Sequence, residues 1–201
     1  MKIALLLLAA GGSRRMGRPK QLLPWKDTIL LDHALQTAVS SKADEVILIL
    51  GAEAETIQKS LKRGRFNILI HKEWEKGLGS TIKKGVSYLE TFDPLPQAVL
   101  IMLGDQPLLG ADHLNSLIDQ FKKGGKGIVA TDYGAKLGVP AVFSREYFTK
   151  LARLQGDSGA GVLIASNVHS ATGIPAGKRT ADLDTPEDYQ SLTQTHQKSD
   201  S

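Results

Sequence analysis

The chain has 201 residues and no cysteine, with 41% apolar residues, 23% charged residues and a formal net charge of +4. This length suits a single domain with a full core, and the lack of cysteine excludes disulfides and cysteine-based metal sites. The small basic excess and the 5% aromatic content argue against a nucleic-acid partner. No apolar run approaches the length of about 20 residues that a membrane span needs. Together with the lack of cysteine, these features lead us to expect a cytoplasmic protein.

The chain begins with an apolar run, residues 3–10, that predicts a buried strand. The run ends in the turn Gly11-Gly12-Ser13, and four cations follow, Arg14, Arg15, Arg18 and Lys20. A glycine-rich turn brings backbone N–H groups close to phosphates, and Arg and Lys side chains neutralise phosphate charge. The N-terminus is therefore expected to bind a nucleotide.

Three other interpretations of this N-terminus compete with nucleotide binding. A secretory signal also has an apolar core followed by small residues, but this run is short and leads straight into cations. The spacing from Gly12 to Gly17 matches a P-loop, but Arg18-Pro19 replaces the Lys and Ser/Thr that reach the phosphates and Mg²⁺. The third alternative is a buried strand followed by a solvated basic turn.

Apolar runs alternate with amphipathic segments along the next hundred residues. Strands are predicted at 3–8, 45–50, 65–70, 98–103 and 127–131, and helices at 28–40, 53–62, 80–91 and 111–123. This alternation indicates β-α-β units, and hence an α/β fold with a mostly parallel sheet. Such folds bind ligands beyond the carboxyl ends of their strands, so the loops after Leu8, Ile70 and Leu103 are the places to look.

The pattern changes after residue 132. A strand is predicted at 138–143, a helix near 145–154, a short helix ending at Ser166 and a strand at 168–171. A further helix is predicted to begin at Pro186, with Thr185 as its N-cap and acids in its first turn. Because no repeat or linker divides the chain, we expect one domain over residues 1–192 and a polar, frayed tail over 193–201.

Two acidic segments are candidate metal sites. Asp105 lies in Gly104-Asp-Gln-Pro107, directly after a predicted strand, where a carboxylate is suited to bind Mg²⁺ together with substrate phosphates. The alternative for Asp105 is an aspartate that begins a proline turn. Asp184 is a candidate second metal ligand and Asp182 a supporting group, with helix capping as the alternative.

Residues 74–81 read Trp-Glu-Lys-Gly-Leu-Gly-Ser-Thr and follow the strand that ends at Ile70. They open a predicted helix, whose free N–H groups could bind an anion or the edge of a base. The alternative is a simple glycine loop with Ser80 as N-cap. No histidine spacing indicates a metal site, and no Ser-His-Asp order or nucleophile elbow supports a hydrolase.

Together these blocks resemble a known family. Residues 8–20, Leu-Ala-Ala-Gly-Gly-Ser-Arg-Arg-Met-Gly-Arg-Pro-Lys, are similar to the signature loop of the MobA-like NTP transferases, which are nucleotidyltransferases related to molybdenum-cofactor synthesis. The resemblance is strongest to the molybdopterin cytidylyltransferase (MocA-like) branch. It continues in family order through residues 21–25, 74–81, 104–107, 156–160 and 182–188.

The resemblance implies a single three-layer α/β/α domain of the Rossmann-like, nucleotide-diphospho-sugar transferase type. It implies Mg²⁺-dependent transfer of NMP from an NTP, CTP rather than GTP, onto a phosphate monoester such as molybdopterin, with release of pyrophosphate. A molybdoenzyme or its chaperone would be a further partner. The implied catalytic residues are Arg15, Lys20 and Asp105, and the implied metal ligands are Asp105 and Asp184. The implied nucleotide contacts are Leu8, Ala9, Ala10, Gly11, Gly12, Arg15, Lys20, Gly77, Gly79, Ser80, Thr81 and Gly104.

Two departures from the family pattern concern the acceptor. The family often has Gly-His-Pro where this chain has Gly138-Val139-Pro140, and it often has Arg where this chain has Gly161. Both departures leave the nucleotide motifs intact. Two alternatives therefore stay open: a sugar- or polyol-phosphate nucleotidyltransferase of the same fold, and a protein that binds a nucleotide or cofactor without chemistry.

Overall fold

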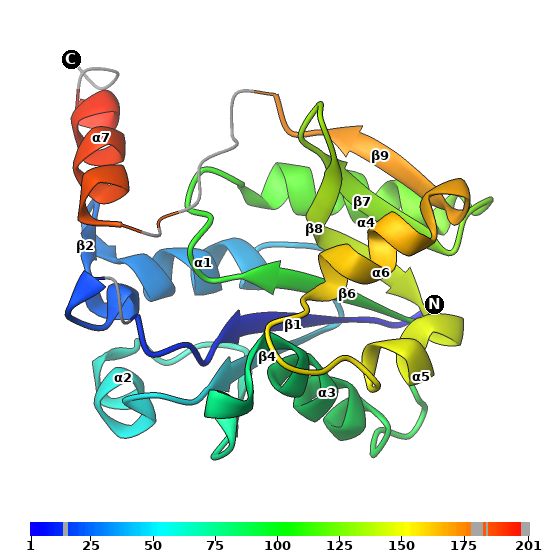
Figure 1. Cartoon of the computed structure of the whole chain (residues 1–201), viewed down its shortest axis with the longest axis horizontal. Helices are drawn as coiled ribbons and strands as arrows, with labels where there is room; N and C mark the ends of the chain where they lie inside the picture. Colours follow the sequence, from blue (N-terminus) through cyan, green and yellow to red (C-terminus); the bar gives the residue numbers. More distant parts are fainter. Residues whose placement is uncertain (14–15, 178–182, 184, 198–201) are drawn as a thin grey trace.

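The protein is represented by a computed structural model that describes residues 1–13, 16–177, 183 and 185–197 (Figure 1). Its centre is a seven-stranded sheet with the strand order β5-β4-β1-β6-β8-β7-β9. The strands are β1 (Ile3–Ala9), β4 (Glu45–Leu50), β5 (Asn67–Ile70), β6 (Ala98–Leu103), β7 (Ile128–Asp132), β8 (Leu137–Ser144) and β9 (Ala171–Pro175).

The sheet is mixed but mostly parallel. β1 pairs in parallel with β4 and with β6, β4 pairs in parallel with β5, and β7 pairs in parallel with β9. β8 runs antiparallel to both of its neighbours, β6 and β7. Because β1 is central and covered on both faces, all seven of its residues are buried, as expected for a continuous apolar run.

Two helical layers cover the faces of the sheet (Figure 1). Alternate residues of β1 point to opposite faces. Leu5 and Leu7 pack with α1 (Leu30–Val39), α2 (Ala54–Ser60) and α4 (Ala111–Lys122). Leu6 and Leu8 pack with α3 (Leu78–Leu89), α5 (Phe148–Leu151) and α6 (Ala160–Ser166). The predicted α/β fold with a mostly parallel sheet is thus confirmed, and it has three layers.

The C-terminal helix α7 (Pro186–Gln197) lies apart from these layers (Figure 1). Its start matches the sequence prediction, since the Thr185 hydroxyl accepts a hydrogen bond from the Asp188 N–H and the Asp188 carboxylate accepts one from the Thr185 N–H at 2.8 Å. These reciprocal bonds form a capping box. The helix continues beyond residue 192 to Gln197. None of the described helices is long and apolar enough to cross a membrane.

Several element boundaries differ from the sequence predictions, and two of these differences have a clear structural cause. Residues 28 and 29 form the short strand β3 (Thr28–Ile29), which pairs with β2 (Pro24–Trp25), so α1 begins only at Leu30. The strand predicted at 168–171 is wrong, because a 3-10 turn (Val168–Ser170) precedes β9. β9 begins at Ala171 because that residue is the first to pair with β7, at Ile128. A tertiary pairing of this kind has no local signal in the sequence.

Candidate active site

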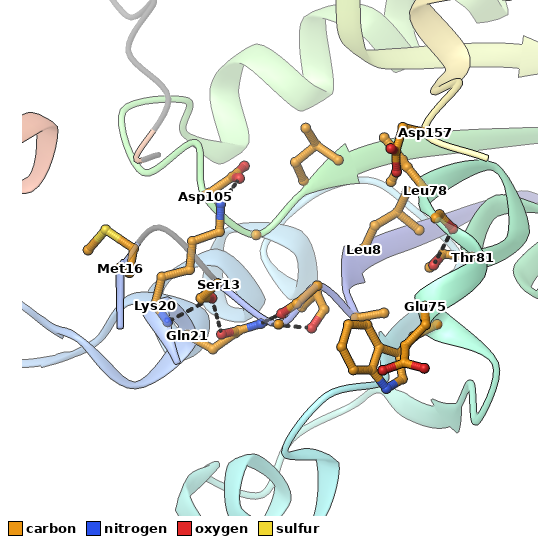
Figure 2. Close-up of a pocket in the computed structure, with 18 residues that line it drawn as sticks. Leu8, Ser13, Met16, Lys20, Gln21, Glu75, Leu78, Thr81, Asp105 and Asp157 are labelled. Atoms are coloured by element: carbon orange, nitrogen blue, oxygen red, sulfur yellow. Dashed lines mark hydrogen bonds and ion pairs between the residues drawn. The ribbon is translucent and has the colours of Figure 1, made fainter. Parts of the chain in front are cut away.

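A cavity of about 510 Å³ opens at the carboxyl ends of β1 and β6 (Figure 2). This is the edge at which parallel α/β sheets bind ligands. The loop after β1, the loop after β6 and the first turn of α3 all contribute to its lining. Of the predicted site residues, those that line the cavity are Leu8, Ala9, Ala10, Gly11, Gly12, Lys20, Gly77, Thr81, Gly104 and Asp105.

The loop after β1 is held in shape by the side chain of Gln21, which is 5% exposed (Figure 2). Its Nε2 donates hydrogen bonds to the carbonyl oxygens of Ala9 at 3.0 Å and Gly11 at 2.9 Å. Its Oε1 accepts a hydrogen bond from the Ser13 hydroxyl at 3.2 Å. The carbonyls of the loop are thus turned toward Gln21, and this short polar network fixes the path of the backbone.

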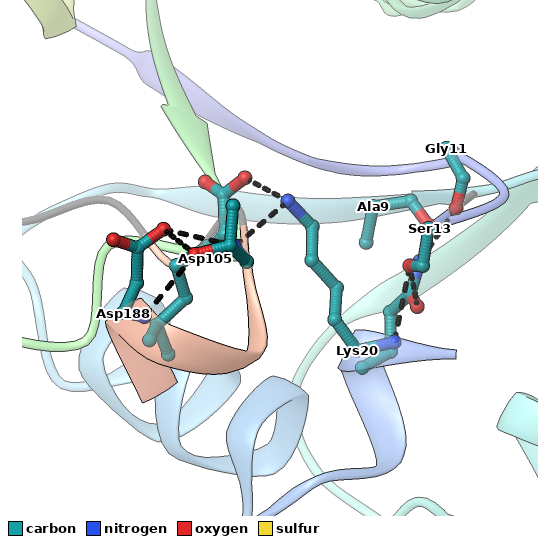
Figure 3. Close-up of polar contacts among 9 residues, drawn as sticks. Ala9, Gly11, Ser13, Lys20, Asp105 and Asp188 are labelled. Carbon is teal, nitrogen blue, oxygen red and sulfur yellow. Dashed lines mark hydrogen bonds and ion pairs between the residues drawn. The ribbon is translucent and has the colours of Figure 1, made fainter. Parts of the chain in front are cut away.

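Ser13 has a φ of 49°, an uncommon conformation for a residue other than glycine. Its hydroxyl accepts a hydrogen bond from the Lys20 N–H at 3.0 Å while donating to Gln21 (Figure 3). These two bonds join the end of the loop to the 3-10 turn Lys20–Leu22. They place Lys20 in the lining of the cavity.

Trp74 forms one wall of the cavity and packs closely against two glycines. A Cβ atom added to Gly51 would lie 2.5 Å from the Trp74 Cβ and 2.7 Å from the Ala10 carbonyl oxygen. A Cβ atom added to Gly12 would lie 3.0 Å from the indole ring. The indole therefore lies directly on the backbone of the β1 loop, which leaves an apolar surface facing the cavity.

Lys20 and Asp105 meet across the cavity (Figure 3). The Lys20 ammonium donates a hydrogen bond to Asp105 Oδ2 and another to the Leu183 carbonyl oxygen at 3.2 Å. The side chains are only 20% and 16% exposed, so the charges of this pair are partly desolvated.

Asp105 Oδ1 is buried, and among the described residues no donor makes a hydrogen bond to it. A buried carboxylate oxygen without a donor is costly unless a ligand satisfies it, and a hard oxygen ligand suits Mg²⁺. Within the described ranges no three His, Cys, Asp or Glu residues gather around a potential metal position. A cation held by Asp105 would therefore need further oxygen ligands from phosphates or water, which is the usual arrangement for Mg²⁺.

Leu183 links the C-terminal segment to the cavity. Its N–H donates a hydrogen bond to the Asp105 carbonyl oxygen at 3.0 Å, and its side chain is fully buried against Trp25 and Leu30. Arg15, Asp182 and Asp184, to which the sequence assigns a catalytic, a supporting and a metal-binding role, lie outside the described residues.

The four predicted contacts at the start of α3 fall into two groups: Gly77 and Thr81 line the cavity, whereas Gly79 and Ser80 do not. Gly77 has a φ of +93°, and a Cβ atom there would lie 2.3 Å from the Gly156 carbonyl oxygen, so this position requires glycine. Thr81 is 3% exposed and lines the cavity with Gly77. Gly79 and Ser80 do not line it: the Gly79 N–H bonds the Gly156 carbonyl at 2.9 Å, and the Ser80 hydroxyl donates to the Gly77 carbonyl at 2.7 Å.

Behind this turn lies His71, which is 5% exposed and contacts the Ser80 hydroxyl through Nε2 at 2.9 Å. Because the single hydroxyl proton of Ser80 goes to Gly77, the His71 Nε2–H is the donor in this contact. Burial lowers the pKa of His71, Glu73 raises it, and Lys84 and Lys76 lower it further. The net shift is downward, so His71 is neutral at pH 7.

Several residues that line the cavity were not predicted as site residues, among them Gln21, Trp74 and Asp157. Gln21 directly follows the first glycine-rich loop, and Trp74 opens the block that contains Gly77 and Gly79. Their position beside the glycines was the available signal. Asp157 follows Gly156 and lies beside Gly77, a contact over 80 residues that only the folded chain shows.

Comparison with known proteins identifies the family of the chain. A family model described as the MobA-like NTP transferase domain matches residues 5–171. The purine catabolism protein PucB of Bacillus subtilis (strain 168) is 30% identical over 194 residues, covering 92% of each chain. The crystal structure of Rv0371c from Mycobacterium tuberculosis H37Rv, a complex with manganese, is 31% identical, covers 96% of this chain and 99% of that one, and has a TM-score of 0.80.

The fold also occurs in more distant structures. A nucleotidyl transferase from Methanothermobacter is 17% identical and covers 98% of this chain and 99% of its own, with a TM-score of 0.83. At this identity the likeness concerns the fold alone. It confirms that the three-layer α/β fold described above is like that of nucleotidyltransferase structures.

Proposed function

The chain belongs to the family of MobA-like NTP transferase domains and is a nucleotidyltransferase of that family; on this basis we propose that it transfers NMP from an NTP onto a small phosphate monoester. In this reaction an oxygen of the acceptor phosphate forms a bond to the α-phosphorus. The bond between the α-phosphorus and the bridging oxygen breaks, and its electron pair leaves with pyrophosphate. The favoured donor is CTP, because the Leu8-Ala-Ala-Gly form of the loop resembles the CTP-using branch.

One observation carries the proposal: Lys20 and Asp105 meet in the cavity at the carboxyl ends of β1 and β6. A glycine-rich loop, a lysine and a buried carboxylate are together what a triphosphate and its counterion require. A protein that merely bound a nucleotide would not need both charges at this depth. The arrangement therefore supports catalysis rather than binding alone.

The proposed nucleotide contacts follow from the lining of the cavity. In this proposal backbone groups of residues 8–12 approach the base and ribose, and Gly77 and Thr81 contact the nucleotide from the start of α3. Gly79 and Ser80 act indirectly, since their hydrogen bonds hold the turn that carries Gly77. Gly104 lines the cavity directly after β6, and its N–H donates a hydrogen bond to the carbonyl oxygen of Leu8 in β1 at 3.1 Å.

Charge neutralisation is the main task of the site. The acceptor phosphate is already anionic at neutral pH, so it needs no general base, and repulsion between two anions is the chief obstacle. Lys20, with Arg15 as its proposed partner, holds the triphosphate and stabilises the negative charge that develops on the leaving pyrophosphate. In the unliganded state Asp105 keeps the Lys20 ammonium at the position where this charge is needed.

Asp105 is the proposed Mg²⁺ ligand, with Asp184 as a second. Asp105 Oδ1 has no donor among the described residues, and Leu183, the sequence neighbour of Asp184, is hydrogen-bonded to Asp105. When bound, Mg²⁺ would supply positive charge to the α- and β-phosphate oxygens. The manganese complex of Rv0371c supports a divalent cation in a relative that is 31% identical.

Molybdopterin is the proposed acceptor, with a molybdoenzyme or its chaperone as a downstream partner, on the strength of the motifs alone. The position at which the family often has histidine is Val139, whose carbonyl accepts hydrogen bonds from Tyr133 at 2.5 Å and Gln106 at 3.4 Å. Gln106 follows Asp105, so this departure lies next to the proposed metal ligand. The replacement of histidine by Val139 favours a second candidate acceptor, a sugar or polyol phosphate, with the nucleotide site unchanged.

A pyrophosphate-release assay over a panel of NTPs and phosphomonoesters tests the proposal. We expect release that requires a divalent cation, one acceptor and one preferred NTP, with CTP above GTP, ATP and UTP. Preference for GTP would overturn the CTP assignment, and release with a sugar phosphate but not with molybdopterin would select the second candidate. Nucleotide binding without pyrophosphate release from any acceptor would contradict catalysis.

A further inference from the structure

A second cavity of about 780 Å³ lies beside the first, between the end of β5, one side of α3 and the segment that follows α5. The two cavities are separated by a partition, which is formed where the start of α3 contacts Gly156. Gly77 lines the first cavity and Gly156 the second, and the Gly79 N–H bonds the Gly156 carbonyl at 2.9 Å. The proposed function makes no use of the second cavity.

The lining of the second cavity is strongly basic. It contains the cations Lys72, Lys76, Lys83, Lys84 and Arg153, against the single carboxylate of Glu73. The formal excess at this one place equals the +4 of the whole chain. Lys76 pairs with Glu73, and among the described residues no carboxylate forms an ion pair with the other four cations. The positive charges of these side chains repel one another, and an anionic ligand would relieve the repulsion.

The neutral part of the lining narrows the class of ligand. The Ser87 hydroxyl supplies a hydrogen-bond donor, and the Ser80 hydroxyl would become one if it left the Gly77 carbonyl. Ile70, Ala152 and Leu154 supply apolar surface. Ile70 is 38% exposed, which is unusual for a large apolar side chain in this protein. The volume falls within the range of small-molecule sites, about 300–1,000 Å³. Cations beside an apolar surface in a concave site suit a phosphorylated small molecule with an organic part.

We propose that the second cavity is an effector site for a nucleoside di- or triphosphate, whose polyphosphate group is bound by Lys72, Lys83, Lys84 and Arg153. The organic part would lie on Ile70 and Leu154. This site is separate from the catalytic cavity, and its ligand need not be the NTP that is consumed. Free pyrophosphate carries a similar charged group without the organic part. An experiment can therefore distinguish binding of a nucleotide from binding of pyrophosphate.

The partition gives the site a route to the catalytic cavity. The His71 Nε2–H donates to Ser80 Oγ, and Ser80 donates to the Gly77 carbonyl. A phosphate that recruits the Ser80 hydroxyl removes the hydrogen bond to Gly77, a residue that lines the first cavity. Occupancy of the second cavity thereby changes the affinity of the first, and by linkage each ligand alters the affinity of the other by the same factor.

Calorimetric titration of the full chain with CTP, ATP and pyrophosphate, at fixed ionic strength with Mg²⁺, tests the proposal. We expect two nucleotide sites per chain. The double variant Lys83→Ala/Lys84→Ala should weaken one site by about tenfold or more, the scale of lost charge-assisted contacts. The control Lys122→Ala/Lys123→Ala removes the same charge from exposed positions at the end of α4 and should leave both sites unchanged.

The outcomes separate this proposal from the proposed function. Loss of the second site in Lys83→Ala/Lys84→Ala supports the proposal even if no acceptor yields pyrophosphate. Weaker filling of that site by pyrophosphate than by nucleotide supports the contact of the organic part with Ile70 and Leu154. One site per chain, or equal weakening in both double variants, would overturn it.

Discussion

The Lys20 ammonium donates a hydrogen bond to the Asp105 carboxylate, although 85 positions separate the two residues. The bond joins the loop after β1 to the end of β6, the two strands that pair along the centre of the sheet. It also brings together the two groups to which we assign the largest part of the proposed reaction. We propose that, on binding of a triphosphate and its cation, Lys20 would exchange Asp105 for a phosphate, and Asp105 would become available to the cation.

Substitution of Lys20 tests its role in binding the triphosphate. Lys20→Ala should lower kcat/KM by about 10²-fold or more, the scale of one lost electrostatic contact. The matched control is Lys42→Ala, which breaks an exposed ion pair with Asp119 at 2.6 Å and should change stability by no more than about 0.5 kcal/mol. Turnover of Lys20→Ala close to that of wild type would refute the assignment.

Substitution of Asp105 tests the metal site. Asp105→Asn keeps the shape of the side chain but removes the charge that attracts a divalent cation. We expect kcat/KM to fall by about 10²-fold and the Mg²⁺ concentration for half-maximal rate to rise. Asp119→Asn, at an exposed position on α4, serves as the control. An unchanged metal requirement in Asp105→Asn would contradict a role as ligand.

Gln21 is expected to position the nucleotide loop. Gln21→Leu leaves the carbonyls of Ala9 and Gly11 without their donor, at a cost of about 1–3 kcal/mol for each buried group that stays unpaired. Gln21→Glu should be equally damaging, since a carboxylate cannot donate to either carbonyl. KM for the NTP should rise more than kcat falls, and Tm should drop.

Steady-state kinetics and thermal unfolding of both Gln21 variants check this expectation. Gln36→Leu, at an exposed position on α1, is the control for the change in side-chain type. If Gln21→Glu bound the NTP as tightly as wild type, the hydrogen bonds to Ala9 and Gly11 would not be what shapes the loop.

His71 predicts a pH dependence of stability. Burial is the main cause that holds its pKa in the folded chain below the ordinary value of about 6.5. The unfolded chain therefore binds the extra proton first, so the contribution of His71 is fully present above pH 6.5 and declines as the pH falls toward the folded pKa. His71→Gln retains a hydrogen-bond donor but cannot titrate, and its stability should fall less between pH 7 and pH 5.

Thermal unfolding across this pH range provides the measurement. The control is His169→Gln, because His169 is exposed and its replacement removes a histidine without changing the interior. If the wild type and His71→Gln lost stability in parallel as the pH falls, the buried imidazole would not be the titrating group.

The order of the elements was predictable because β1, β4 and β6 are short apolar runs covered on both faces. β4 and β6 begin and end at the predicted residues. The antiparallel course of β8 and the late start of β9 depend on pairing with β7, which no local pattern encodes. Sequence indicates which residues belong to a strand more readily than which strands become neighbours.

The candidate site, like the fold, was predictable from the sequence only in part. Motifs placed Lys20 and Asp105 at strand ends, and the fold brings them together. The roles of Gly79 and Ser80 depend on which side of the first α3 turn each residue faces, a difference that spacing alone does not fix. The second cavity draws its cations from three separate segments, so only the folded chain shows them as one cluster.

Identification of the reaction product tests nucleotidyl transfer itself. Phosphorus NMR of a reaction that contains CTP, Mg²⁺ and an active phosphomonoester follows the fate of each phosphate. We expect one pyrophosphate for each CTP consumed and a new diphosphate linkage that joins CMP to the acceptor. Release of inorganic phosphate with CDP, or consumption of CTP without a new diphosphate linkage, would contradict nucleotidyl transfer.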